Sequence, residues 1–105
     1  MIIKYNGNFS NSSIVENLER LTNLIFKLLP MREEGKDWII PLQNIIVEIT
    51  GMGNLLIDQQ TALFSVVSRL EGLLTYTDKD DFLLFRKTIF ECLGLLSKVK
   101  RCLMD

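Results

Sequence analysis

Hydrophobic residues recur along most of the chain at alternating steps of three and four positions, the repeat of an α-helix that buries one face. The most regular run comes last and consists of Phe82, Phe85, Ile89, Cys92, Leu96, Val99 and Leu103. Acidic residues lie at the start of this run and the basic residues Lys98, Lys100 and Arg101 lie in its last turns, the arrangement that the helix dipole favours. We therefore predict a helix over about residues 79–104 with one face in a packing seam.

A second regular run predicts a helix over about residues 13–29. Ser13 and Glu16 have the spacing of a capping box at its start, and Pro30 is expected to end it, because proline disrupts a helix interior. Its inward face is expected to carry Ile14, Leu18, Leu21, Ile25 and Leu28.

The middle of the chain predicts two further helices. Asp37 can cap a helix over about residues 38–50 with Pro41 in its first turn, where proline costs little. Its stripe is expected to be Leu42, Ile45, Ile46 and Ile49. A helix over about residues 55–75 is expected to bury Leu56, Leu63, Val67, Leu70 and Leu74.

The two glycines between these helices, Gly51 and Gly53, favour a break in the chain. The alternative is one long bent helix, since each glycine in a helix costs only about 1 kcal/mol relative to alanine. Two other glycines, Gly72 and Gly94, lie inside predicted helices. Each either marks a close approach of two helices or is an exposed, tolerated glycine.

Short connections between long helices predict a single all-α domain over residues 1–105, an up-and-down antiparallel four-helix bundle. The alternative is three long helices, with the second and third fused and bent near Gly51–Gly53. Trp38 is expected to lie as a lid over one end of the core. Residues 1–12 are expected to form a flexible arm, whose Ile2 and Ile3 dock on the bundle or on a neighbouring subunit.

The first and last predicted helices carry more apolar residues than one packing seam needs. The short second helix would also leave the far end of the last helix uncovered. We therefore expect a second copy of the chain, or a client helix, to cover these positions. The expected partner-binding residues are Phe26, Leu29, Phe90, Leu95, Val99 and Leu103.

Charge and chemistry narrow the function. The chain has 12 Lys+Arg against 13 Asp+Glu and no histidine. Such a balance argues against nucleic-acid binding, and the lack of histidine removes the usual general base and metal ligand. We therefore expect no enzyme, cofactor, metal or small-molecule substrate.

The two cysteines, Cys92 and Cys102, lie on the last predicted helix. Their separation of about 15 Å along its axis is too large for a disulfide. Cys92 belongs to the apolar seam and is expected to be a small buried hydrophobe. Cys102 lies beside a basic terminus and is either an ordinary or a reactive thiol.

No apolar run reaches the length of a membrane-spanning helix, and no secretory signal is visible. The expectation is a cytoplasmic, non-catalytic protein-interaction module, an adaptor or chaperone-like bundle that forms a homodimer or binds a client helix. The alternative is a small immunity-type or membrane-surface bundle, with the basic end of the last helix facing lipid or a membrane protein.

Overall fold

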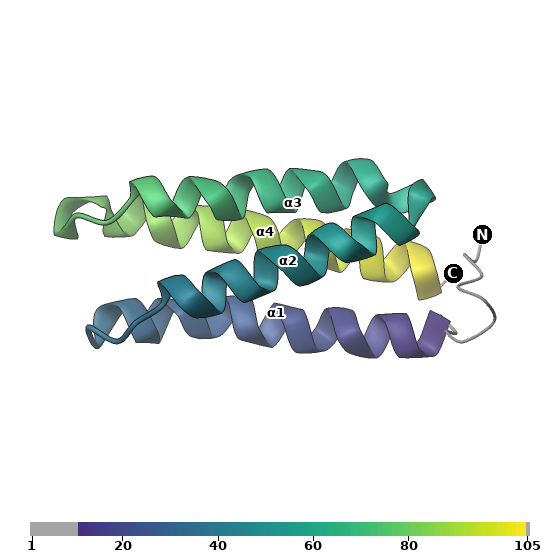
Figure 1. Cartoon of the computed structure of the whole chain (residues 1–105), viewed down its shortest axis with the longest axis horizontal. Coiled ribbons are helices and arrows are strands. Elements are labelled where there is room, and N and C mark those ends of the chain that lie inside the picture. Colours follow the sequence, from purple (N-terminus) through teal and green to yellow (C-terminus); the bar gives the residue numbers. More distant parts are fainter. Residues whose placement is uncertain (1–10, 105) are drawn as a thin grey trace.

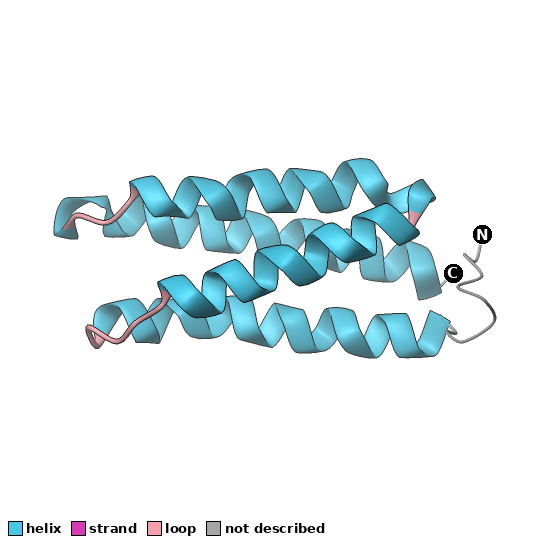
Figure 2. Ribbon diagram, in the orientation of Figure 1, coloured by secondary structure: helices cyan, strands magenta, loops and turns pink. Residues whose placement is uncertain are grey.

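Four antiparallel α-helices run up and down the long axis of the protein (Figure 1). The computed structural model describes residues 11–104. The helices are α1 (Asn11–Glu33), α2 (Ile39–Leu55), α3 (Gln60–Gly72) and α4 (Phe82–Met104), with short 3-10 turns at Ile57–Gln59, Leu73–Thr75 and Lys79–Asp81. Figure 2 shows that short loops join them and that no strand occurs in the described part. The predicted all-α four-helix bundle is confirmed.

The helices are arranged in a square in which each packs on the next, and α4 returns beside α1. The start of α1 and the end of α4 therefore lie at the same end of the bundle (Figure 1). The predicted stripes of α1 and α4 are buried, and of the latter only Phe82 is partly exposed. Among the described residues, the core holds no buried polar or charged side chain, so apolar packing is the main interaction that aligns the helices.

The first helix is longer than predicted at both ends. It begins at Asn11, so residues 11 and 12 belong to a helix and Ser13 lies inside it rather than at its N-cap. It also continues through Pro30 to Glu33. The prediction that Pro30 ends the helix is wrong, because a proline in the last turns removes only one backbone hydrogen bond. Residues 1–10, with the expected docking of Ile2 and Ile3, lie outside the described residues.

A glycine further along the chain supplies the true end of α1. Gly35 has a φ of +73°, a left-handed conformation that costs glycine nothing. Its N–H donates to the Arg32 carbonyl at 3.2 Å, and the Lys36 N–H donates to the Met31 carbonyl at 2.8 Å. These two bonds form a Schellman motif, which satisfies the last carbonyls of the helix.

The second helix does not break at its glycines. It runs through Gly51 and Gly53 to Leu55, and the chain leaves the helix at Leu56, whose side chain is buried. The Gln60 side chain donates a hydrogen bond to the Gly53 carbonyl at 3.1 Å and so satisfies one terminal carbonyl. Four helices are present as predicted, but the break lies after the glycines. The N-cap of α2 is Trp38 rather than the predicted Asp37, although the Asp37 carboxylate accepts a hydrogen bond from the Ile39 N–H at 3.0 Å.

The buried stripe of α3 differs from the prediction. Val66 and Leu73 are fully buried, whereas Leu74 is 41% exposed and Val67 is only partly buried. Each pair of neighbours is apolar, so the sequence allows two stripes that differ by about 100° around the helix. Packing against α2 and α4 selects Leu63, Val66, Leu70 and Leu73.

An aromatic cluster closes the end of the bundle that holds the α1–α2 loop. Trp38 is 9% exposed, and its ring meets the Phe85 ring edge to face at 5.0 Å between centroids. The Arg32 guanidinium lies 4.8 Å from the Phe85 ring centroid and donates to the backbone carbonyls of Tyr76 and Asp78 at 2.8 and 2.7 Å. Trp38 is therefore a lid on the core, as predicted, and Arg32 ties α1 to the α3–α4 connection.

One glycine marks a close approach of two helices, and it is neither of the two predicted. A Cβ added at Gly72 or Gly94 meets nothing within 4 Å. A Cβ at Gly53 would lie 2.5 Å from the Phe64 ring of α3. Gly53 therefore gives Phe64 its place against α2.

These glycines give a matched test of packing. Gly51→Ala should raise the free energy of unfolding by about 0.5–1 kcal/mol, because alanine favours the helix and its Cβ meets nothing. Gly53→Ala should lower it by about 1 kcal/mol, because the clash with Phe64 outweighs that gain. Urea denaturation measures both. In a Phe64→Ala background the penalty at Gly53 should vanish, and a penalty that persists there would contradict the assigned contact.

Candidate functional site

The most prominent exposed aromatic pair lies between α1 and α4. Phe26 and Phe90 are 49% and 43% exposed, and their rings meet edge to face with centroids 6.0 Å apart. The Arg86 guanidinium lies 5.1 Å from the Phe90 ring centroid. Both phenylalanines were predicted partner-binding residues, and the structure brings them together.

Leu83 extends this pair along α4. It lies seven residues before Phe90, so both share one line of the helix, and it is 75% exposed. We call the surface formed by Phe26, Leu83 and Phe90 the aromatic side. A large exposed leucine beside two exposed aromatics is typical of an interaction surface.

The other predicted partner-binding residues do not lie on this surface. Leu29, Val99 and Leu103 are 7%, 1% and 5% exposed and belong to the core. Leu95 is half-buried and lies five positions after Phe90, about 140° around the helix, so it faces away from the aromatic side.

The expectation that the far end of α4 stays uncovered is wrong for a simple reason. The expectation assumed that the short second helix lies beside the last turns of α4. In the structure α1 lies there, and it is as long as α4, with 23 residues each. The Lys100 ammonium lies 3.7 Å from the Glu19 carboxylate, so the first half of α1 runs beside the last turns of α4. An aspartate at Val99 or Leu103 would therefore disrupt folding rather than association.

The aromatic side is bordered by positive charge. Helix α4 carries Arg86, Lys87, Lys98, Lys100 and Arg101 against one acidic residue, Glu91. Glu91 is itself paired, since its carboxylate lies 3.8 Å from the Arg69 guanidinium of α3. The exposed part of α4 therefore has a positive potential.

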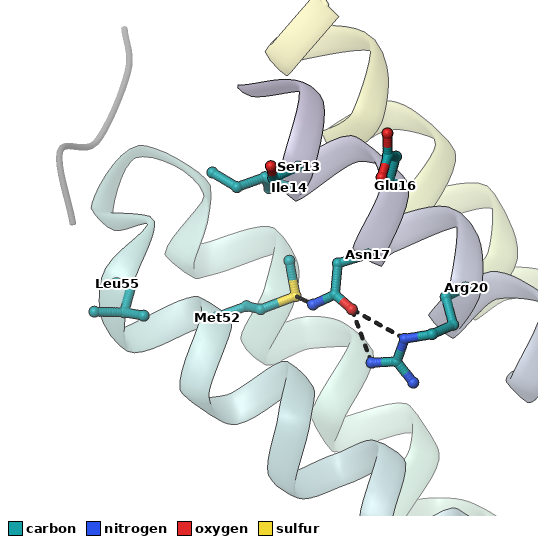
Figure 3. Close-up of a pocket in the computed structure, with 7 residues that line it drawn as sticks. All are labelled: Ser13, Ile14, Glu16, Asn17, Arg20, Met52 and Leu55. Carbon is teal, nitrogen blue, oxygen red and sulfur yellow. Dashed lines mark hydrogen bonds between the residues drawn. The ribbon is translucent and has the colours of Figure 1, made fainter. Parts of the chain in front are cut away.

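A cleft of about 530 Å³ separates the start of α1 from the end of α2. Figure 3 shows how its polar groups lie: the Asn17 amide points to the Met52 sulfur, and its carbonyl oxygen accepts two hydrogen bonds from Arg20, at 2.8 and 3.1 Å. Arg20 also reaches the Glu48 carboxylate at 2.6 Å. The cleft is lined by Ser13, Ile14, Glu16, Asn17, Arg20, Met52 and Leu55. Asn17 and Arg20 bond to each other and to their neighbours, so they do not converge on a ligand.

The opposite long side of the bundle, formed by α2 and α3, is poor in charge. Between Trp38 and Ser68 the only charged residues are Glu48 and Asp58. On this surface Ile40 and Val47 are 60% and 70% exposed, and Phe64 is 37% exposed. We call it the uncharged side. The low charge of this side is visible in the sequence as a long stretch almost without charged residues. The periodicity of the apolar residues does not indicate which of them are exposed.

Metal-ligating side chains and free thiols are the remaining reactive groups among the described residues. These residues contain no group of three or more His, Cys, Asp or Glu side chains that could hold a metal ion. Burial raises the pKa of the Cys92 thiol to about 12, since desolvation disfavours the thiolate more than the charge of Arg69 favours it. Cys92 is fully buried and Cys102 is exposed, and both are free thiols.

Within the described residues, no helix is by itself long and apolar enough to cross a membrane. Helix α2 and the segment Ile57–Thr75 reach that length and hydropathy only together, and a bend of 118° separates them.

Comparison with known proteins gives no relative. No family model, curated protein or solved structure matches this chain.

The two thiols should differ sharply in reactivity. In the native protein at pH 8, a disulfide reagent such as DTNB should modify Cys102 within minutes, and Cys92 only after denaturation, because the thiolate is the reactive form. Two rapidly reacting native thiols would contradict the burial of Cys92.

The raised pKa of Cys92 also predicts a dependence of stability on pH. The neutral, buried Cys92 thiol contributes fully to the free energy of unfolding below the pKa of the unfolded thiol, near 9.0. This contribution is lost as the pH rises towards the folded-state pKa of about 12. Between pH 8 and pH 11 the wild type should lose on the order of 2 kcal/mol more than Cys92→Ala, as measured by urea denaturation. Equal losses in the two proteins would contradict the shift.

Proposed function

We propose that this protein is a non-catalytic protein-binding module whose aromatic side takes an amphipathic helix of a client, as an adaptor or chaperone-like bundle does. The observation that carries the proposal is the exposed pair of Phe26 and Phe90 at the joint between α1 and α4. Such a joint presents an exposed apolar surface on which the apolar face of a third helix can pack.

The charges around this surface favour a client of particular chemistry. The basic residues of α4 complement acidic residues along one edge of the client helix. Helix α1 contributes Glu19 and Glu33 near the same side, so the surface has both signs of charge. A client helix can set an acidic edge against α4 and a different edge against α1, whereas an anionic membrane presents one sign of charge to both helices, which is why we favour a protein partner over the membrane-surface alternative.

A model peptide tests this proposal before any client is identified. The probe is a fluorescein-labelled amphipathic helix with leucines on one face and glutamates along one edge of that face, and its match has lysines in place of the glutamates. Fluorescence anisotropy should show at least tenfold tighter binding of the glutamate peptide, with affinity falling as salt rises.

Substitutions on the bundle locate the binding surface. Phe26→Asp and Phe90→Asp should each weaken binding at least tenfold, because each puts a charge into the apolar contact. Val47→Asp on the opposite side is the matched control and should bind as the wild type does. Equal binding of both peptides, or no effect of either phenylalanine substitution, would contradict the proposal.

Vesicles test the competing function. Phosphatidylcholine vesicles with and without phosphatidylglycerol are floated with the protein at low and high salt. We expect the protein to stay in the soluble fraction. Salt-sensitive flotation with the anionic vesicles, abolished by Phe90→Asp, would instead assign the aromatic side to a membrane surface.

A further inference from the structure

The uncharged side owes its character to where its few charges point. Glu48, the single charged residue of α2, turns to α1 and pairs with Arg20. Arg69 of α3 turns to α4 and pairs with Glu91. Such exposed pairs contribute little to stability, but they leave the middle of the α2–α3 side without a charge.

The remaining exposed residues form an interface-like pattern. Ile40 and Val47 lie seven residues apart on one line of α2, and Phe64 and Leu74 lie across from them on α3 and the turn that follows it. Charged residues mark the ends of the side, with Asp58 at one end and Glu71 at the other. An apolar centre with charges at its rim is the composition of a protein interface.

We propose that a second copy of this chain covers the uncharged side, in a twofold dimer in which α2 and α3 of each copy pack on α2 and α3 of the other. A side without charge cannot select a different protein by electrostatic complementarity, but it meets its own copy without like-charge repulsion. Its polar residues, among them Gln43, Asn54 and Thr61, both donate and accept hydrogen bonds. They can therefore pair with themselves across a twofold axis.

The size of this side fits the proposal. The bundle measures 45 by 19 by 19 Å, so one long side has about the area that each partner buries in a standard interface, ~800 Å². The net charge of −1 adds no long-range repulsion between copies. The dimer leaves the aromatic side of each copy facing outward, so it does not depend on the proposed client and does not compete with it.

Sedimentation velocity of the whole chain between about 1 and 200 μM tests the dimer, and circular dichroism checks the fold of each variant. The wild type should sediment as a dimer at the upper concentrations. Val47→Asp and Ile40→Asp should raise the dissociation constant at least thirtyfold with unchanged helicity, because both side chains are mostly exposed in the monomer. Phe90→Asp and Leu83→Asp, on the aromatic side, should leave the dimer intact.

Three outcomes would overturn the proposal. If the wild type stays monomeric throughout the concentration range, the chain does not form the proposed dimer. A dimer that dissociates with Phe90→Asp and survives Val47→Asp assigns self-association to the aromatic side instead. A dimer unaffected by all four variants places the interface elsewhere. Peptide binding by Val47→Asp is measured in parallel, so failure of the dimer and failure of the client site are distinguished.

Discussion

The bundle depends on the simultaneous burial of four apolar stripes, none of which can be covered by a single partner helix. Among the described residues the core side chains are apolar, and the weak hydrogen bond that the buried Cys92 thiol of α4 donates to the Val66 carbonyl of α3, at 3.9 Å, adds little to the alignment of the helices. Alignment comes from the fit of side chains, such as the Phe64 ring against Gly53, and from contacts at the ends, such as Arg32 on the α3–α4 connection. The core residues serve packing, so the residues that contact a partner must lie outside the core.

These outer residues divide the molecule into two unlike long sides. The side formed by α1 and α4 has exposed aromatics bordered by positive charge, whereas the side formed by α2 and α3 is apolar and nearly free of charge. The lateral ion pairs Arg20–Glu48 and Arg69–Glu91 help to separate them, because they draw charge to the joints with the neighbouring helices. Two sides of different chemistry suit the two partners that we propose, a client and a second copy.

The sequence predicted the fold class and the inward faces of α1 and α4, because an unbroken series of steps of three and four marks one stripe on each helix, even though further apolar residues lie beside it. The prediction from sequence was wrong where the preference of a single residue or a short pattern was overridden by packing between helices. Pro30 did not end α1, which continues to Glu33 and is closed by the Schellman motif at Gly35. In α3 the neighbours Val66 and Val67 made two stripes possible, and only packing chose between them. The candidate surface was partly predictable: Phe26 and Phe90 are exposed, but Leu29, Val99 and Leu103 were placed outside because the cover that the long α1 gives to α4 was not foreseen.

The position of the outer helices has a mechanical consequence. Helix α1 starts and α4 ends at the same end of the bundle (Figure 1), and the two helices lie side by side along their length. Tension applied between these points would peel the pair apart one turn at a time, beginning at Ile14 and Leu103, instead of shearing the whole contact at once. The force needed to separate the helices should therefore be low at first and rise where the Phe26 and Phe90 rings are in contact.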